Sequence, residues 1–432
     1  MEVVKKYGEH IKKNIDDNPK KALNMIKLGL DLEKIRIKAK PEKGLPKAYQ
    51  KLNSMAVKST LKALQHPEKT VWTNIFSPVE ILQCFGLEPL SLECFSSFIS
   101  GFHCEDYFMD YAENEGIAST LCSYHKNFLG AADSGLLSKP AYALTTSMVC
   151  DGNINTFRYL SEKYDVPTYM LDIPNEYSKD AEEYVVTQLK ELISLLETKF
   201  QTKLDINQLK DIIERENQSK RYYMEFLQEQ NKRYYPNTLT INLFMLFATH
   251  LNIGSKEALD FFEFLLEDVK KYPRGKGMGK SIFWVHLFPY YQDTLKSYFN
   301  INEDYQIKAC DINLDYLEEM DVEHPLNALA KKMICNLYNG SYEKKSNMIS
   351  DIVQKLNIDA VIHFSHWGCK QSLGGVMLLK EEMQKNNIPM LIMDGDGMDR
   401  RNSPDGQMKT RLEAFLEMIQ KEEGEKDDRI CV

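Results

Sequence analysis

The sequence lacks any apolar run long enough to cross a lipid bilayer. Its longest apolar stretches, such as residues 243–248, fall far short of the roughly 20 residues that a spanning helix needs. The opening segment, MEVVKKYGEHIKKNIDDNPKK, carries charges throughout and contains no apolar core of signal-peptide length. These absences argue against a membrane partner and against export, so we expect a cytoplasmic protein.

The sequence also lacks an excess of basic residues. Lys and Arg number 54 against 63 Asp and Glu, which gives a formal net charge of −9 with His neutral. Because proteins bind nucleic-acid phosphates through positively charged surfaces, this balance argues against nucleic acid as the main partner. The 432 residues, 43% of them apolar, exceed one typical domain and are enough for more than one core.

Paired cysteine motifs are absent as well. The nine cysteines are scattered over the whole chain and include no CxxC pair. A secreted disulfide framework is normally a short chain with an even number of closely spaced cysteines. The pattern is therefore typical of an intracellular protein with reduced thiols.

Changes in composition divide the chain into four parts. The first part is rich in Lys and helix formers, and we expect short helices there, with Pro41 and Pro46 in a linker. In the third part the strand signal disappears, and Asp205 with Gln208 forms a capping-box-like helix start. The predicted parts are an N-terminal helical extension (1–70), a first α/β domain (71–200), a helical connector (201–275) and a second α/β domain (276–432).

Short apolar runs alternate with helical stretches on both sides of the connector. Such alternation indicates parallel sheets covered by helices. We therefore predict an α/β fold with two doubly wound parallel-sheet domains joined by helices. The predicted strands are residues 142–146, 166–171, 281–287, 306–311, 360–365 and 389–394. The predicted helices are residues 180–199, 325–338, 344–356, 370–386 and 406–421.

Local context separates the cysteines into two groups. Six lie in apolar runs, among aromatic residues or near the C-terminus, and are interpreted as packing or bystander residues. The other three, Cys122, Cys150 and Cys369, each occur where a loop gives way to a helix. The six bystanders are Cys84, Cys94, Cys104, Cys310, Cys335 and Cys431.

Cys150 and Cys369 follow predicted strands at equivalent points of the two α/β domains. Ligands bind beyond the carboxyl ends of parallel strands, and a helix amino terminus stabilises a thiolate. Three thiolates converging on an interdomain cleft suit a soft metal or an iron–sulfur cluster. Spacing alone leaves three alternatives open: a cluster, a zinc site with His125 or His366 as fourth ligand, and unligated cysteines.

Two other segments receive structural interpretations. The Gly-rich basic loop PRGKGMGK (273–280) precedes a predicted strand, whereas a phosphate-binding loop follows one, so we interpret it as a connecting loop. His286 and Tyr290 end a predicted strand in SIFWVHLFPYYQD, a plausible place for pocket residues. The density of aromatic residues there favours a buried aromatic cluster.

Several separated motifs resemble one protein family. SHWGCKQSLGG (365–375) and IPMLIMDGDGMDRRNSPDGQMKTRLEAFLEM (388–418) strongly resemble the 2-hydroxyacyl-CoA dehydratase family, which also includes benzoyl-CoA reductase subunits. The resemblance covers most of the chain from about residue 70 onward, with its motifs in the family's order. The further matching motifs are SPVEILQCFGLEPLSLE, GIASTLCSYHKNFLG, TTSMVCDG and VPTYMLDIP.

The resemblance implies a cofactor and partners. Members look like heterodimers in which each subunit holds a [4Fe-4S] cluster through three cysteines. The matching positions here are Cys122, Cys150 and Cys369. Three protein thiolates leave one iron open to water, hydroxide or a substrate oxygen.

The resemblance also implies a radical dehydration of a 2-hydroxyacyl-CoA. Acid–base catalysis, worth about 10² to 10⁴ in rate, does not readily remove a non-acidic β-hydrogen. In the implied route, an ATP-hydrolysing iron–sulfur activator protein supplies one electron and the thioester carbonyl becomes a ketyl radical. The α-hydroxyl then leaves, and loss of the β-proton with return of the electron gives the 2-enoyl-CoA.

Four residues are candidates for the substrate site. Glu93 aligns with an acidic position of the family's substrate pocket, which makes it a candidate acid or base, with a surface carboxylate as the alternative. His366, Lys370 and Gln371 flank Cys369 and are candidates to bind the CoA thioester or to tune the cluster through hydrogen bonds.

The sequence departs from the family pattern at one position. Subunits that bind substrate often have a serine three residues before the proline of the PVE motif, where this chain has Ile75. The leading hypothesis remains a dehydratase subunit. The departure keeps open a subunit that only relays electrons, and a benzoyl-CoA reductase type of subunit is a second enzyme alternative.

Overall fold

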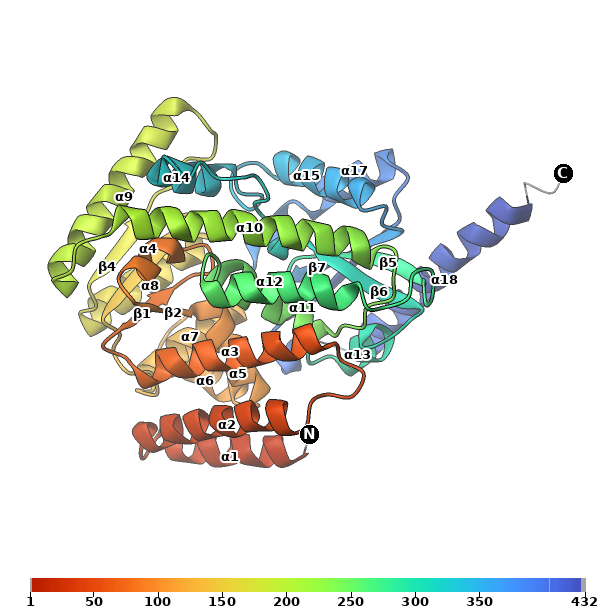
Figure 1. The fold of residues 1–432 in the computed structure, drawn as a ribbon. Coiled ribbons are helices and arrows are strands. Elements are labelled where there is room, and N and C mark those ends of the chain that lie inside the picture. Colours follow the sequence, from red (N-terminus) through yellow and green to blue (C-terminus); the bar gives the residue numbers. More distant parts are fainter. Residues whose placement is uncertain (1, 404, 429–432) are drawn as a thin grey trace.

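The structure is a computed structural model that describes residues 2–403 and 405–428, with residues 421–428 described by their backbone alone. Cys431 lies outside the described residues. The chain is mostly helical and contains two four-stranded sheets whose strands all pair in parallel (Figure 1). The predicted α/β class with two parallel sheets is therefore confirmed.

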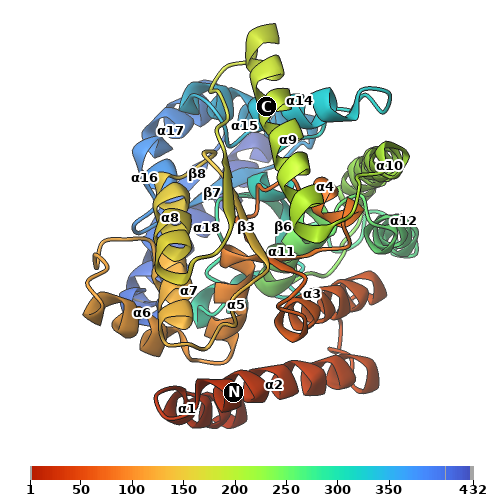
Figure 2. The same cartoon turned by 90° about the vertical axis from the view of Figure 1, so that its left-hand side faces the viewer.

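The N-terminal helices are longer than their sequence suggested. Helices α1 (Glu2–Ile15) and α2 (Pro19–Ala39) form a hairpin at one end of the molecule, and α3 (Lys47–Gln65) connects it to the first sheet (Figures 1 and 2). The expectation of short helices was wrong because nothing interrupts α2 between its Asn18 N-cap and the linker that holds Pro41 and Pro46.

The first sheet has the strand order β2-β1-β3-β4. The sequence predicted β3 and β4 and missed β1 and β2. Both missed strands have only four residues, and β2 contains Pro89, which weakens a strand signal. The strands are β1 (Thr70–Thr73), β2 (Glu88–Ser91), β3 (Tyr142–Thr146) and β4 (Thr168–Leu171).

The second sheet repeats this topology with the order β6-β5-β7-β8. All four strands were predicted. Its two central strands are largely buried and contain the apolar runs 282–285 and 360–362. In each sheet the order changes direction between the first and third strands, which creates a crevice at their carboxyl ends. The strands are β5 (Lys280–Val285), β6 (Tyr305–Cys310), β7 (Ala360–His366) and β8 (Met390–Gly395).

Helices cover both sheets. The helix predicted at 370–386 is divided at Gly375, a residue type that weakens a helix interior. Glycine is needed there because a Cβ would stand 2.0 Å from the Tyr342 ring. The helices of the first sheet are α4 (Val79–Cys84), α5 (Leu92–Gly101), α6 (Glu105–Asn114), α7 (Ser123–Asp133), α8 (Asp151–Tyr164) and α9 (Lys179–Phe200). Those of the second are α13 (Asp293–Phe299), α14 (Pro325–Cys335), α15 (Tyr342–Lys355), α16 (Lys370–Gly374), α17 (Val376–Lys385) and α18 (Asp405–Asp428), with short 3₁₀ turns at Asp311–Asn313 and Arg400–Asn402.

The segment between the two sheets is helical, as the missing strand signal indicated. Figure 1 shows α10 and α12 crossing the front of the molecule side by side. Asp205 caps α10 by accepting a hydrogen bond from the Asn207 N–H. The elements are α10 (Ile206–Gln230), α11 (Leu239–Leu246), a π-helical turn (Phe247–Leu251) and α12 (Lys256–Val269).

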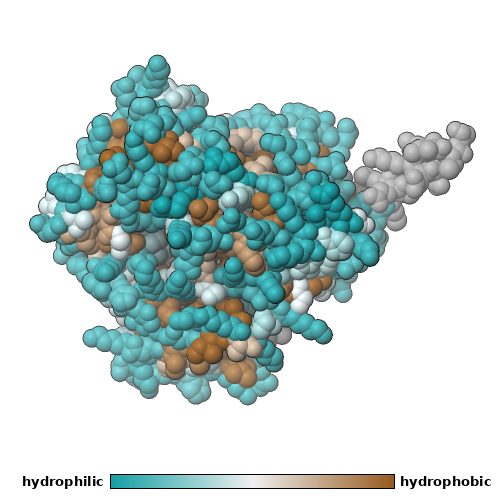
Figure 3. Space-filling view, viewed as in Figure 1, coloured by the Kyte–Doolittle hydropathy of each residue, from teal (hydrophilic) through white to brown (hydrophobic). Residues whose placement is uncertain are grey.

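The surface in the same view is mostly hydrophilic, with apolar side chains gathered over the α1–α2 hairpin at the bottom (Figure 3). Leu28, Leu32 and Ile35 of α2 are among the exposed apolar residues. In the part of the chain that the structure describes, no helix combines the length and the apolar character that a bilayer crossing requires.

Candidate functional site

Two of the three selected cysteines occupy equivalent places at the sheet crevices. Cys150 follows β3 and is the N-cap of α8, and Cys369 follows β7 and is the N-cap of α16. Strands β3 and β7 hold the same position in their sheets. The Gly152 N–H donates to Cys150 Sγ at 3.2 Å. Each thiol thus lies at a helix amino terminus, and at Cys150 a backbone N–H points at the sulfur, a contact that stabilises a thiolate.

The third cysteine lies against the loop that carries Cys369. Cys122 is the N-cap of α7. A Cβ added at Gly368 would stand 2.8 Å from both N and Cα of Cys122, and Gly368 has a φ of +77°. Only glycine fits this contact without strain. The close approach joins the second sheet to α7 and brings Cys122 near Cys369.

The three thiols influence one another electrostatically. Burial raises the pKa of Cys122 well above its ordinary value, and the negative charges of Cys369 and Cys150 raise it further. Burial, followed by the charge of Cys369, raises the pKa of Cys150 to about 11. Ionising all three thiols together therefore requires a compensating positive charge nearby, which a bound metal centre supplies.

Each of these thiols also faces a different buried histidine. Burial is the main cause that lowers the pKa of all three histidines, to about 4 for His125, so the rings are neutral at pH 7. The three contacts are Cys122 Sγ to His366 Nε2 at 3.2 Å, Cys369 Sγ to His286 Nε2 at 3.4 Å and Cys150 Sγ to His125 Nε2 at 3.9 Å.

The tautomer of His366 follows from its second contact. The Gly397 N–H donates to His366 Nδ1 at 2.9 Å, so Nδ1 is an acceptor. A neutral imidazole carries one N–H, which must then be on Nε2 and directed at Cys122 Sγ. His366 was predicted to bind substrate or to tune the cluster. Its side chain is 0% exposed, and its Nε2 contacts the sulfur of Cys122, one of the candidate cluster ligands.

Two of the eight non-glycine residues that have a positive φ among the described residues lie at the same place. Val149, directly before Cys150, has a φ of 70°, and His286, directly after β5, has a φ of 77°. Such conformations cost about 1–3 kcal/mol for a non-glycine residue and persist where the surroundings hold them. At His286 the backbone N–H donates a hydrogen bond to Asp311 Oδ1 at 2.7 Å, and this bond helps to hold the conformation.

A groove of about 410 Å³ opens beside Cys150 between the two halves of the molecule. Lys370 and Gln371, both predicted site residues, line it. Lys370 Nζ lies 3.7 Å from Asp151 Oδ2 across the groove, but both side chains are more than 80% exposed, so this pair contributes little stability. The buried Gln371 Oε1 has no hydrogen-bond partner among the described residues, which leaves an acceptor for a ligand donor.

Glu93 lies in the first turn of α5 with a carboxyl group that titrates near neutral pH. The Ser91 hydroxyl donates to Glu93 Oε2 at 2.6 Å. Burial raises the pKa of Glu93 to about 7, against the opposing effects of the hydrogen bonds and of His250. The charge of Glu93 in turn raises the pKa of Cys150. A carboxyl with this pKa near the candidate ligands is suited to accept or donate a proton.

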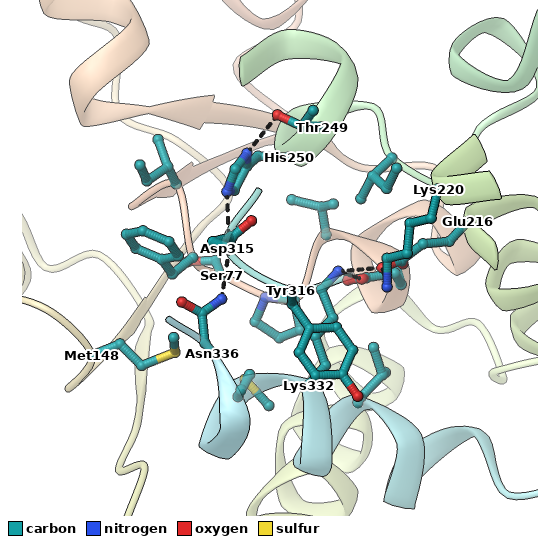
Figure 4. Close-up of a pocket in the computed structure, with 18 residues that line it drawn as sticks. Ser77, Met148, Glu216, Lys220, Thr249, His250, Asp315, Tyr316, Lys332 and Asn336 are labelled. Atoms are coloured by element: carbon teal, nitrogen blue, oxygen red, sulfur yellow. Dashed lines mark hydrogen bonds and ion pairs between the residues drawn. The ribbon is translucent and has the colours of Figure 1, made fainter. Parts of the chain in front are cut away.

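A second cavity, lined in part by His250, contains buried charges (Figure 4). Lys332 Nζ lies 2.6 Å from Glu80 Oε1 and 2.8 Å from Glu216 Oε1, and His250 Nε2 lies 3.3 Å from Asp315 Oδ2. Its volume of about 40 Å³ has room for buried water but not for an acyl chain. Its charges pair with one another, which indicates a structural network.

The described residues contain no group of three or more His, Cys, Asp or Glu side chains placed to bind a single metal ion. The zinc alternative with His125 or His366 therefore finds no preformed site among them. Ligands of a multi-iron cluster bind separate iron atoms, so they need not converge on one point. The three thiols, each at a helix amino terminus with a neutral histidine beside it, are thus the candidate cluster ligands among the described residues.

Two residues of the site were not among its predicted members. The end of its strand marked His286 as a plausible pocket residue, but the aromatic residues around it favoured a buried aromatic cluster. Its ring contacts Cys369. Lys345 was not singled out, although it is buried and lines the groove. No sequence signal marks it, because a lysine in a helix is ordinarily a surface residue.

Comparison with known proteins gives one family over most of the chain. Residues 74–419 match the family described as "2-hydroxyglutaryl-CoA dehydratase, D-component". The matched segment includes all the candidate site residues, from Ile75 to Gln371.

Three curated relatives are similar over nearly their whole lengths. The (R)-phenyllactyl-CoA dehydratase alpha subunit of Clostridium sporogenes is 25% identical over 84% of this chain and 93% of its own. The lactoyl-CoA dehydratase subunit alpha of Anaerotignum propionicum is 23% identical over 82% and 91%. The (R)-2-hydroxyisocaproyl-CoA dehydratase alpha subunit of Clostridioides difficile is 21% identical over 84% and 93%.

Proposed function

The chain belongs to the 2-hydroxyglutaryl-CoA dehydratase D-component family, and from this we propose that it is the alpha-type subunit of a 2-hydroxyacyl-CoA dehydratase. The enzyme removes water from an (R)-2-hydroxyacyl-CoA to give the 2-enoyl-CoA. All three relatives named above are alpha subunits of such dehydratases, which supports a heterodimer with a second, beta-type subunit. The free thiols support a cytoplasmic location.

We propose Cys122, Cys150 and Cys369 as ligands of a [4Fe-4S] cluster. The observation that carries this proposal is that all three are helix N-caps whose charges influence one another across the two halves of the fold. When bound, such a cluster stores and passes on a single electron. The His366 N–H directed at Cys122 Sγ supports the same role, because hydrogen bonds to ligand sulfur tune a cluster.

The groove beside Cys150 is the proposed site of the CoA thioester. Lys370 at its rim offers a cation, and Gln371 offers an amide with an unpaired oxygen. Glu93 is the proposed proton acceptor, since its carboxyl titrates near pH 7 and its charge reaches Cys150. Glu93 does not line the groove itself; it follows β2, whose carboxyl end lies at the same edge of the first sheet as the carboxyl end of β3.

The proposed reaction starts with one electron supplied by an ATP-dependent iron–sulfur activator protein. The electron enters the thioester carbonyl and forms a ketyl radical anion, and the α-C–O bond breaks to release hydroxide. The β-proton passes to a base, for which Glu93 is the candidate. Return of the electron leaves the 2-enoyl-CoA, so the net change is the loss of one water.

Ile75 favours a second candidate function, in which this chain relays electrons while the partner binds the substrate. Where subunits that bind substrate often have a serine, this chain has a buried apolar side chain that offers no hydroxyl. Ile75 lines the small charged cavity and not the groove beside Cys150. Adding a 2-hydroxyacyl-CoA to the heterodimer separates the two functions: a changed electron paramagnetic resonance spectrum of this chain's cluster supports substrate binding, and an unchanged one supports the relay.

Anaerobic purification with iron and acid-labile sulfide assays tests the cluster. We expect about four irons and four sulfides per chain. Cys150→Ala should lose the iron and sulfide, because the two thiolates that remain are too few to hold the cluster. Cys84→Ala on α4 is the matched control and should retain them, since it also removes a buried thiol. Stoichiometric zinc or no metal in the wild-type chain would overturn the proposal.

A further inference from the structure

Lys345 is a buried lysine in the wall of the groove beside Cys369. It belongs to α15, is 1% exposed and lines the groove together with Cys150 and Gln371. Nζ lies 3.0 Å from Asp311 Oδ2 and 3.7 Å from the centre of the Tyr338 ring. Beyond this ion pair, Nζ makes no hydrogen bond to the residues that the structure describes.

A continuous set of contacts links Lys345 to the thiol of Cys369. The partner carboxylate, Asp311, accepts the His286 N–H on Oδ1 at 2.7 Å and the Tyr338 hydroxyl on Oδ2 at 2.7 Å. His286 Nε2 lies 3.4 Å from Cys369 Sγ. Removing Lys345 thus changes both the charge beside the thiol and the anchor of the strained His286 backbone.

The positive end of the ion pair faces the groove. Lys345 lines the groove together with Cys150, whereas its partner Asp311 does not line it. The ammonium is therefore the end of the pair on the side of the proposed cluster ligand.

A buried charge is costly to maintain, and the cost is offset only by other charges and hydrogen bonds close to it. An ammonium group near an electron acceptor stabilises the form with one more negative charge, and low-dielectric surroundings strengthen the effect. In this crevice the cluster would gain such a charge first, before the electron reaches the thioester, and its potential can be measured without substrate.

We propose that Lys345 is a positioning residue that raises the reduction potential of the cluster held by Cys122, Cys150 and Cys369. The inference rests on the proposed function, since it needs the cluster. The reduced activator protein gives up one electron, the cluster gains it, and the ammonium of Lys345 stabilises the added negative charge.

The test is a redox titration of the anaerobic holoenzyme, followed by electron paramagnetic resonance, on Lys345→Met and Lys345→Arg. We expect the midpoint potential to fall in Lys345→Met and to remain near the wild-type value in Lys345→Arg, with iron content unchanged in both. Lys308→Met is the matched control and should leave the potential unchanged. Lys308 is also buried, but its Nζ donates to the Gln230 and Arg233 carbonyls at the opposite end of the sheet.

A second variant keeps the test decisive if Lys345→Met fails to fold. Asp311→Asn retains an acceptor for the His286 N–H but removes the negative charge, so the potential should rise, opposite in sign to Lys345→Met. An unchanged potential in Lys345→Met or Asp311→Asn with full iron content overturns this inference alone. A wild-type chain without iron overturns the proposed function and this inference together.

Discussion

Among single residues, Glu93 has the property that most directly suits catalysis. Its side chain is half-buried, and the partial loss of water around the carboxyl favours the neutral form, so the pKa rises to about 7. Other carboxylates nearby are held by cations, as Glu80 is by Lys332. Glu93 has only hydrogen-bond donors and the more distant His250. Its protonation state is therefore free to change during a reaction near neutral pH.

Glu93→Gln should lower the dehydration rate by about 10² to 10⁴, the usual value of a general acid or base. If Glu93 is the base, the wild-type rate rises as the pH rises through 7, and that dependence disappears in the variant. Initial rates from pH 5.5 to 8.5 check this. Glu88→Gln is the control. Glu88 is the first residue of β2, at the opposite end of the strand from Glu93, and it pairs with Lys62. Equal losses in both variants would contradict the assignment.

The same raised pKa predicts a stability effect. The folded state holds the proton more tightly than the unfolded state, so this stabilisation is complete below the unfolded pKa near 4.5 and is lost as the pH rises through 7. Glu93→Gln should therefore gain melting temperature relative to the wild type between pH 5 and pH 8. Thermal unfolding at several pH values measures this, and a constant difference between the two proteins would count against a buried carboxyl.

At the scale of elements, the amino termini of α7 and α16 meet through Gly368 and Cys122. Both termini begin with a cysteine, and the glycine permits the close contact between their loops. The geometry of two candidate ligands is thus set by one backbone contact. A side chain at this position has to separate the two helix ends.

Gly368→Ala should destabilise the protein by more than the roughly 1–3 kcal/mol that positive φ alone costs, and should lower the iron content. The added Cβ meets the Cys122 backbone at 2.8 Å. Gly116→Ala is the matched control, since Gly116 has a φ of +92° and a Cβ added there would meet no atom within 4 Å. Denaturant unfolding and iron analysis compare the two. Similar losses in both would mean that the contact is unimportant.

For the whole molecule, buried ion pairs join the connector to both halves. Lys332 of α14 contacts Glu80 of α4 and Glu216 of α10, and both carboxylates are nearly inaccessible to solvent. Each element belongs to a different part of the chain. The position of the charged cavity relative to the crevices therefore depends on this network as well as on the apolar core.

Lys332→Met should destabilise the protein by about 3–5 kcal/mol, because it leaves two buried carboxylates without their shared cation. Burial then raises their pKa values, so the loss should be smaller at pH 5 than at pH 8. Lys58→Met, which removes the exposed partner of Glu257, should cost no more than about 1 kcal/mol. Urea unfolding at both pH values measures the difference, and an equal cost for the two variants would exclude an important buried network.

Much of the fold could be predicted from local pattern. The strands of the second sheet are buried runs such as 282–285 and 360–365, which are recognisable in the sequence. β1 and β2 could not be found in this way, because four residues beside Pro89 carry too little signal. The length of α2 was missed because its charged composition does not show where a helix continues.

Local sequence was sufficient to identify which cysteines precede helices and which family motifs occur in order. These features depend on neighbouring residues, as with Cys150 before α8. The three-dimensional packing was needed to show that His286, His366 and Lys345 lie against those thiols or in the same groove. Their contacts join residues tens to hundreds of positions apart, through the packing of two sheets and a connector, and no local pattern records such distances.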